Sequence, residues 1–141
     1  MASSLLDTSV YVSAFRRATA SAFTPRNDDP ESQLWLSAVV LEELYAGATD
    51  RNREDVKQLQ RGFDRVARII VPTLDDWAQA GRGLAQLAAK YDYEAIGRGR
   101  LTNDALIAVS AARMKIKVIT TNARDFGRLA EFCALQWQLD T

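Results

Sequence analysis

Short apolar runs alternate with longer segments of helical periodicity along this chain, and that alternation limits the folds open to it. Strands are predicted at residues 4–6, 34–37, 69–71, 118–120 and 135–139, and helical patterns fill most of the sequence between them. Strands joined through helices run parallel, and a parallel sheet is buried under helices on both faces. The sequence therefore predicts an α/β fold with a short-stranded, mostly parallel central sheet, in which residues 135–139 alternate like an edge strand.

The predicted helices differ in how much of their surface they bury. Helices are expected at 9–18, 39–48 and 51–68, and Thr73 is expected to cap another, with Asp76 three residues further on. Between residues 105 and 112 only Ser110 is polar, so this helix should be buried on most sides. The helix opened by Thr73 places these residues on one face: Leu74, Trp77, Gly81, Leu84, Ala88 and Tyr91. Packing in or on the core is expected for Cys133, Trp35, Trp77 and Trp137.

The 141 residues have the size of one domain, residues 1–141. The N-terminal apolar run has no basic segment before it and is interrupted by Asp7, so we do not expect a signal peptide. No stretch approaches the ~20 apolar residues of a membrane span. A cytoplasmic protein with no membrane contact is expected, with surface loops at 24–31 and 95–100.

Residue types that are missing narrow the chemistry. The chain has no histidine and a single cysteine, Cys133. This excludes Ser-His-Asp and Cys-His triads, histidine-containing zinc sites and internal disulfides. Lys and Arg number 18 and balance 18 Asp and Glu, which argues against a non-specific nucleic-acid coat or a polybasic membrane binder. Carboxylates, or a metal held by oxygen ligands, are the main remaining route to catalysis near neutral pH.

Four acidic side chains occupy positions from which they could form one site at an edge of the sheet. Asp7 directly follows the first strand, and Glu43 lies on the helix after the second. Asp104 falls in the first turn of the buried helix, and Asp125 follows a late strand. The carboxyl ends of parallel strands meet at one edge, so these acids are expected to converge there. Carboxylates that lie close together repel unless a cation neutralises them, and oxygen-only ligands suit Mg²⁺ or Mn²⁺ and hydrolytic phosphoryl transfer.

Each acid alone also has a simpler interpretation. Asp7, Asp104 and Asp125 stand where helix caps are common. Glu42 and Glu43 have similar apolar neighbours at helical spacing, so periodicity does not separate a ligand from a surface residue. Only the joint pattern favours a site.

Four segments resemble, in this order and spacing, the acidic motifs of PIN-domain nucleases: LLDTSVYV, LSAVVLEELYAGA, LTNDALIAVSA and VITTNARDF. More closely, the chain resembles the VapC toxins of type II toxin–antitoxin modules, across nearly its whole length. The resemblance implies a three-layer α/β/α sandwich and endoribonuclease activity that depends on Mg²⁺ or Mn²⁺. It also implies a small VapB-like antitoxin partner, a homodimer that joins the antitoxin in a hetero-oligomer, and DNA contact only through that antitoxin.

The family's functional residues carry over by motif. Glu43, rather than Glu42, stands directly before the leucine of the family's EL-x-x-G pattern. Ser9, Thr120 and Asn122 match polar residues that support the acids. The implied catalytic and metal-binding residues are Asp7, Glu43, Asp104 and Asp125.

A neutral protein with an acidic site needs cations to hold RNA. Arg98 and Arg100 lie in the glycine-containing loop just before Asp104 and are the expected RNA contacts. Further candidates are Arg16, Arg17, Arg124 and Arg128, although a solvated surface charge is the simpler interpretation for the first, second and fourth of these.

Three other interpretations fit part of this pattern. A phosphoacceptor receiver domain is disfavoured, because no adjacent acidic pair follows the first strand and no strand-end lysine follows the threonine motif. A housekeeping PIN nuclease and a non-catalytic PIN-fold module that acts with a DNA-binding partner remain open.

Overall fold

A five-stranded parallel sheet organises the computed structural model, which describes residues 2–17, 32–92 and 101–140. The spatial order of the strands is β3-β2-β1-β4-β5, and every neighbouring pair is parallel. The predicted α/β fold is confirmed, and the last strand lies at an edge as expected. The strands are β1 (Ala2–Leu6), β2 (Ser32–Ser37), β3 (Ile69–Ile70), β4 (Lys117–Thr120) and β5 (Trp137–Leu139).

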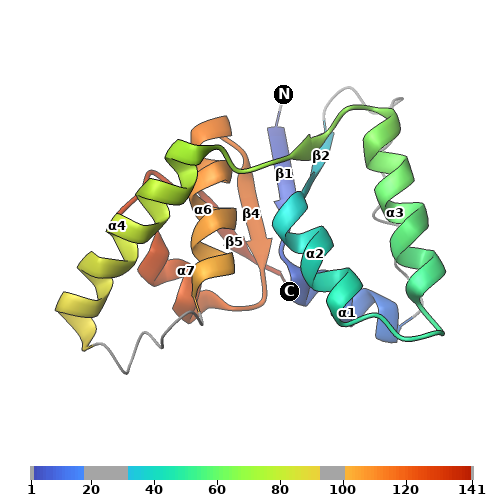
Figure 1. The fold of residues 1–141 in the computed structure, drawn as a ribbon, viewed down its shortest axis with the longest axis horizontal. Coiled ribbons are helices and arrows are strands. Elements are labelled where there is room, and N and C mark those ends of the chain that lie inside the picture. The colour runs from blue at the N-terminus through green and yellow to red at the C-terminus, as the bar shows by residue number, and fades with distance from the viewer. Residues whose placement is uncertain (1, 18–31, 93–100, 141) are drawn as a thin grey trace.

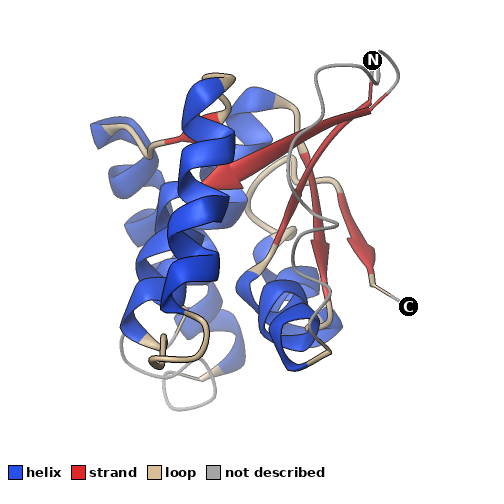
Figure 2. Cartoon of the chain, turned by 90° about the vertical axis from the view of Figure 1, so that its right-hand side faces the viewer, coloured by secondary structure: helices blue, strands red, loops and turns tan. Residues whose placement is uncertain are grey.

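Helices flank this sheet in two groups. In Figure 1, α1, α2 and α3 lie on the right of the strands, and α4, α6 and α7 lie on the left. Figure 2 shows the same helices in blue around the red strands after a turn of 90°. Within the described ranges, no helix is both long and apolar enough to cross a membrane. The helices are α1 (Thr8–Arg16), α2 (Ala38–Ala46), α3 (Arg53–Arg65), α4 (Leu74–Tyr91), α6 (Thr102–Met114) and α7 (Ala123–Leu129).

The apolar side chains that the sequence placed inside form a core cluster between these layers. All seven residues from 105 to 111 are buried, as expected for α6. Ser110 is fully buried within this run, and its hydroxyl donates to the backbone oxygen of Leu106 at 2.6 Å. That bond satisfies the one polar side chain of an otherwise apolar surface. Cys133, Trp35 and Trp137 pack against the core as predicted.

Two predicted helix features need correction. The helix predicted at 51–68 is shorter, because α3 ends at Arg65 and Ala67 then adopts a positive φ of 56° before β3 begins. The predicted face of α4 is also wrong at its start, since Leu74 is 86% exposed and Trp77 is 54% exposed. The residues that α4 buries instead are Asp76, Ala80, Gly83 and Leu87.

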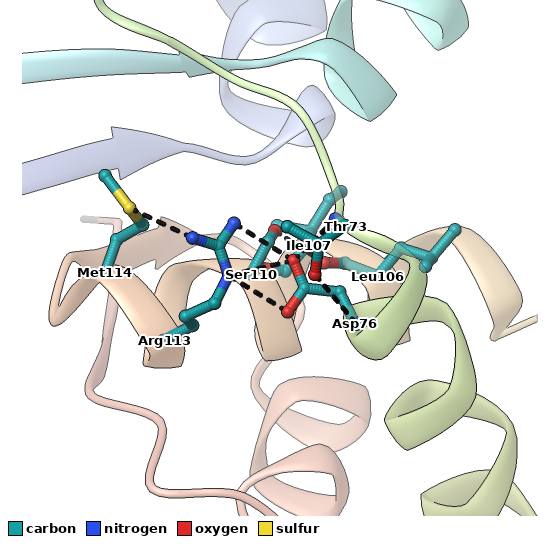
Figure 3. A network of polar contacts seen from close by, with 7 residues as sticks. All are labelled: Thr73, Asp76, Leu106, Ile107, Ser110, Arg113 and Met114. Atoms are coloured by element: carbon teal, nitrogen blue, oxygen red, sulfur yellow. Dashed lines mark hydrogen bonds and ion pairs between the residues drawn. The ribbon is translucent and has the colours of Figure 1, made fainter.

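A buried carboxylate explains how α4 is rotated (Figure 3). Asp76 is 1% exposed, and both of its oxygens accept hydrogen bonds from Arg113 on α6, at 3.1 and 3.0 Å. Asp76 and Thr73 also form a reciprocal capping box at the start of α4, which confirms the predicted cap. The apolar periodicity of α4 carries no information about this ion pair, which turns Asp76 inward and Leu74 outward.

Candidate functional site

Three strands end at the same edge of the sheet, and the segments that follow them carry most of the candidate residues. β1 ends at Leu6, β2 at Ser37 and β4 at Thr120. Asp7 continues the β1 pairing, because its backbone N–H donates to the Ile119 oxygen at 2.8 Å. Ser37 caps α2 by accepting from the Val39 backbone N–H at 3.2 Å. The end of β1 therefore fixes the position of Asp7, and the Ser37 cap fixes the start of α2, which carries Glu43.

Asp7 is buried at 5% exposure and occupies the N-cap position of α1, but its side chain makes no capping hydrogen bond. Instead its Oδ2 accepts from the hydroxyls of Ser9, at 3.0 Å, and Thr120, at 2.9 Å. The simpler interpretation of this carboxylate as a helix cap is therefore wrong. Its Oδ1 accepts no hydrogen bond from the described residues, which leaves one oxygen for another partner.

The predicted supporting residues connect the first acid to the fourth. Thr120 is fully buried, and its Oγ1 accepts from the Asn122 backbone N–H at 3.0 Å while donating to Asp7. The side-chain amide of Asn122 donates to Oδ2 of Asp125 at 2.7 Å. Ser9 accepts from the backbone N–H of the residue after Thr120, at 3.2 Å. One continuous set of hydrogen bonds thus runs from Asp7 to Asp125.

Asp125 lies in the first turn of α7 and is 4% exposed. Asn122 caps this helix, since its Oδ1 accepts from the Asp125 backbone N–H at 3.2 Å. Arg124 forms a salt bridge with Asp125, with Nε 3.5 Å from Oδ1, although the arginine side chain is 63% exposed. The fourth acid is thus held from two directions, and its neighbouring cation is open to solvent.

Glu43 and Glu42 differ in a way that helical periodicity does not reveal. Glu42 is exposed, whereas Glu43 is half-buried and its Oε1 accepts from the Thr8 hydroxyl at 2.8 Å. Sequence reasoning missed Thr8. The signal available was a hydroxyl residue directly after Asp7, in the same motif as Ser9.

Asp104 lies in the first turn of α6 and is half-buried. The N-cap of α6 is Leu101, which makes no side-chain capping bond. A carboxylate in this turn is favoured by the helix dipole.

The chemistry of these donors fits a hard divalent cation, because carboxylate oxygens are the ligands that Mg²⁺ and Mn²⁺ prefer. Within residues 2–17, 32–92 and 101–140, however, no group of three or more acidic side chains lies close enough together to hold a metal ion. Hydroxyl and amide groups instead connect Asp7 to Asp125, and the Thr8 hydroxyl binds Glu43. The expected RNA contacts, Arg98 and Arg100, lie outside the described residues.

Two further side chains bear on what the site can do. Burial raises the pKa of the Cys133 thiol, so little reactive thiolate is present near neutral pH. The guanidinium of Arg128 lies 4.5 Å from the centre of the Tyr91 ring, which favours a packing role for this cation. Arg16 and Arg17 are exposed at the end of α1, as a solvated charge would be.

A cavity of about 900 Å³ opens beside Glu43. Its apolar surface comes from Val12 and Phe15 on α1 and from Leu44 on α2. Charged groups surround these side chains, including Arg16 and Asp55. Apolar side chains and one of the candidate acids, Glu43, therefore line the same cavity.

Residues 4–132 match the family described as the PIN domain. No curated protein matches the sequence. Similar solved structures include VapBC-1 from nontypeable Haemophilus influenzae, at 20% identity, 95% coverage of each chain and a TM-score of 0.60. DNA-bound VapBC from Salmonella typhimurium has 19% identity and a TM-score of 0.57, covering 99% of this chain and 98% of that one. VapBC-5 from Mycobacterium tuberculosis, a member of the VapBC family of toxin-antitoxin systems, has 27% identity and a TM-score of 0.51, with the same coverage.

Proposed function

The chain belongs to the PIN-domain family, and on that premise we propose that it is a divalent-metal-dependent endoribonuclease acting as the toxin of a toxin–antitoxin pair. One observation on Asp7 carries the proposal. This carboxylate is buried at the end of a strand, yet its two hydrogen bonds come from hydroxyls and both fall on Oδ2. A carboxylate acting as the helix cap would accept from the backbone N–H groups of α1, and Asp7 does not. Asp7 is instead held in place with one oxygen left for a ligand.

The candidate acids have the chemistry that such a metal site requires. PIN nucleases usually use divalent metals. Asp7, Glu43 and Asp104 would hold one or two Mg²⁺ or Mn²⁺ ions, and Asp125 would complete the coordination or orient a water. When bound, such an ion makes a water nucleophilic near neutral pH and offsets charge on the phosphate. Within the described residues no three of these acids lie close enough together to hold an ion, so we expect metal binding to draw them together.

The chain's other residues would orient these acids. Ser9 and Thr120 fix the rotamer of Asp7, and Asn122 fixes that of Asp125. Because a water attacks the phosphate, the RNA 2′-hydroxyl is not needed as the nucleophile. The expected products carry 5′-phosphate and 3′-hydroxyl ends.

Cleavage of RNA by the purified chain tests this proposal. We expect cleavage with Mg²⁺ or Mn²⁺ and none in EDTA, and we expect Asp7→Asn to abolish it without unfolding the chain. Robust cleavage in EDTA, or full activity in Asp7→Asn, would overturn the metal mechanism. A folded wild-type chain that cleaves no RNA with either ion would favour the non-catalytic binding module.

Arg98 and Arg100 are proposed to hold the RNA backbone beside these acids, on the strength of their position in the sequence just before Asp104. Each phosphate contact releases counterions, so replacing both arginines by alanine should weaken RNA binding. The slope of the logarithm of the binding constant against the logarithm of the salt concentration should become shallower by about 0.7 per lost contact. Arg65→Ala, an exposed change at the end of α3, is the matched control. An unchanged affinity and salt slope would make both residues solvated surface charges.

The cavity beside Glu43 supports a protein partner. An extended or helical tail of an antitoxin would place apolar side chains against Val12, Phe15 and Leu44, and a lysine or arginine near Glu43. Among the similar solved structures, VapBC-5 is described as a member of a family of toxin–antitoxin systems, and several, including VapBC from Salmonella typhimurium, are bound to DNA. We propose that this chain acts in the cytoplasm, forms a homodimer, joins its antitoxin in a hetero-oligomer, and contacts DNA only through that partner.

Expression in cells tests the partner. The chain should be toxic alone and harmless when expressed with a small protein encoded beside it. Val12 is 36% exposed, so Val12→Asp should weaken that complex while leaving RNA cleavage intact. If wild-type expression is harmless without any partner, a housekeeping PIN nuclease becomes the better assignment.

A further inference from the structure

Thr8 directly follows one candidate acid in the chain and hydrogen-bonds to another that lies far away in the sequence. It is the first residue of α1 and directly follows Asp7. Its Oγ1 donates to Oε1 of Glu43 on α2 at 2.8 Å, across 35 positions of sequence. Both side chains are half-buried, so water competes with this hydrogen bond less than it would at an open surface.

Glu43 and Asp7 therefore share a hydrogen-bonding arrangement. In each acid one oxygen is held by hydroxyl donors, and the other accepts no hydrogen bond from the described residues. A free glutamate samples many rotamers, because its side chain has three rotatable bonds. Threonine is branched at Cβ and stiff about χ1, so its hydroxyl is a donor with a well-defined position.

Two adjacent hydroxyls therefore serve two different acids. Ser9 donates to Asp7, which precedes it by two residues, and Thr8 donates to Glu43 on another helix. We propose that Thr8 is a positioning residue that holds Glu43 ready as a metal ligand, an inference that rests on the proposed metal-dependent function. Thr8 itself would touch neither metal nor RNA, and it would act only through Glu43.

Calorimetric titration of Mn²⁺ into the purified full-length chain tests the inference without relying on activity. Thr8→Val keeps the shape of the side chain and removes the donor, so we expect Mn²⁺ binding to weaken by about 10- to 100-fold. Thr8→Ser keeps the hydroxyl and should stay within about threefold of wild type. Ser13→Ala, which removes a hydroxyl elsewhere on α1, is the matched control and should bind like wild type.

RNA cleavage supplies a second measurement. Thr8→Val should need more Mn²⁺ for half-maximal cleavage, with a smaller change in the rate at saturating Mn²⁺. Thermal melting checks that each variant folds, and Thr8→Ala replaces Thr8→Val if the latter does not.

The outcomes separate this inference from the function on which it rests. If wild type binds Mn²⁺ and Thr8→Val binds it equally well, Thr8 has no positioning role. If Thr8→Ser is as weak as Thr8→Val, the hydroxyl is not what matters and the inference is wrong. If wild type binds no Mn²⁺, the metal-dependent function itself is overturned, and the role of Thr8 with it.

Discussion

Asp76→Ala should be among the most destabilising single changes in this chain. The carboxylate is 1% exposed and accepts from Nε of Arg113 at 3.1 and 3.0 Å, and Nη2 lies 3.0 Å from Oδ2 (Figure 3). It also accepts from the Thr73 backbone N–H at 3.0 Å. The substitution removes the link between α4 and α6 together with half of the capping box.

The size of the effect follows from these contacts. Losing the cap costs about 1 kcal/mol. Breaking a fully buried ion pair from one side costs about 3 to 5 kcal/mol. The Arg113 side chain is 38% exposed, so water replaces part of what it loses, and we take about 2 kcal/mol for this contribution. The expected total is about 3 kcal/mol, which lowers the melting temperature by about 10 °C for a chain of this length.

The effect should also depend on pH. Burial alone would raise the pKa of Asp76, but hydrogen bonds from Arg113 and Thr73 outweigh it and hold this pKa below its ordinary value of 3.8. A carboxyl whose folded-state pKa is lowered stabilises the fold above its ordinary pKa, and that stabilisation is lost as pH falls through the folded value. Urea unfolding of wild type and Asp76→Ala should therefore differ less at about pH 3 than at pH 7.

Asp75→Ala is the matched control, because Asp75 lies in the same first turn of α4 and is exposed. It should cost less than about 0.5 kcal/mol. Equal destabilisation by the two changes, or a difference between wild type and Asp76→Ala that does not vary with pH, would show that the buried ion pair does not stabilise the fold.

Two further predictions concern packing and the site. A Cβ on Gly83 would overlap the Phe132 ring, whereas a Cβ on Gly81 meets nothing within 4 Å. Thermal melting should therefore show Gly83→Ala destabilised and Gly81→Ala stabilised by about 0.5 to 1 kcal/mol, and the reverse order would show the α4 packing to be wrong. Thr120→Val removes one of the two donors to Asp7, so RNA cleavage should fall by about 10- to 100-fold in a folded chain, and an unchanged rate would deny Thr120 its supporting role.

Much of the fold could be predicted because the spacing of apolar residues indicates where the strands and helices lie and which faces they bury. The β-branched run before Pro72 and the apolar run of α6 around Ser110 need only the hydrophobic effect to place them. The start of α4 could not be predicted this way. Asp76 is buried because it pairs with Arg113, which lies 37 positions away, and no local sequence pattern predicts that pairing. Leu74 and Trp77 are exposed as a result.

The candidate site shows the same division. Strand ends and motif spacing place Asp7, Asp125 and their hydroxyl and amide partners at one edge of the sheet. Periodicity alone could not separate Glu43 from Glu42, because the difference lies in a hydrogen bond from Thr8 across 35 positions. Closure of the acids around a metal depends on a bound cation, which is not encoded in the sequence, so that closure stays a prediction.

The adjacent glutamates Glu42 and Glu43 allow metal-dependent cleavage to be tested at a single position of the site. Single-turnover cleavage of RNA at saturating Mn²⁺ would be measured for wild type, Glu43→Gln and Glu42→Gln, with melting curves to confirm that all three fold. Loss of a metal ligand should cost more than loss of its supporting partner, so Glu43→Gln should slow cleavage by more than about 100-fold. Glu42→Gln, which changes an exposed carboxylate one residue away, should stay within about twofold of wild type. Equal rates for the two variants would contradict the assignment of these acids as a metal-dependent nuclease site.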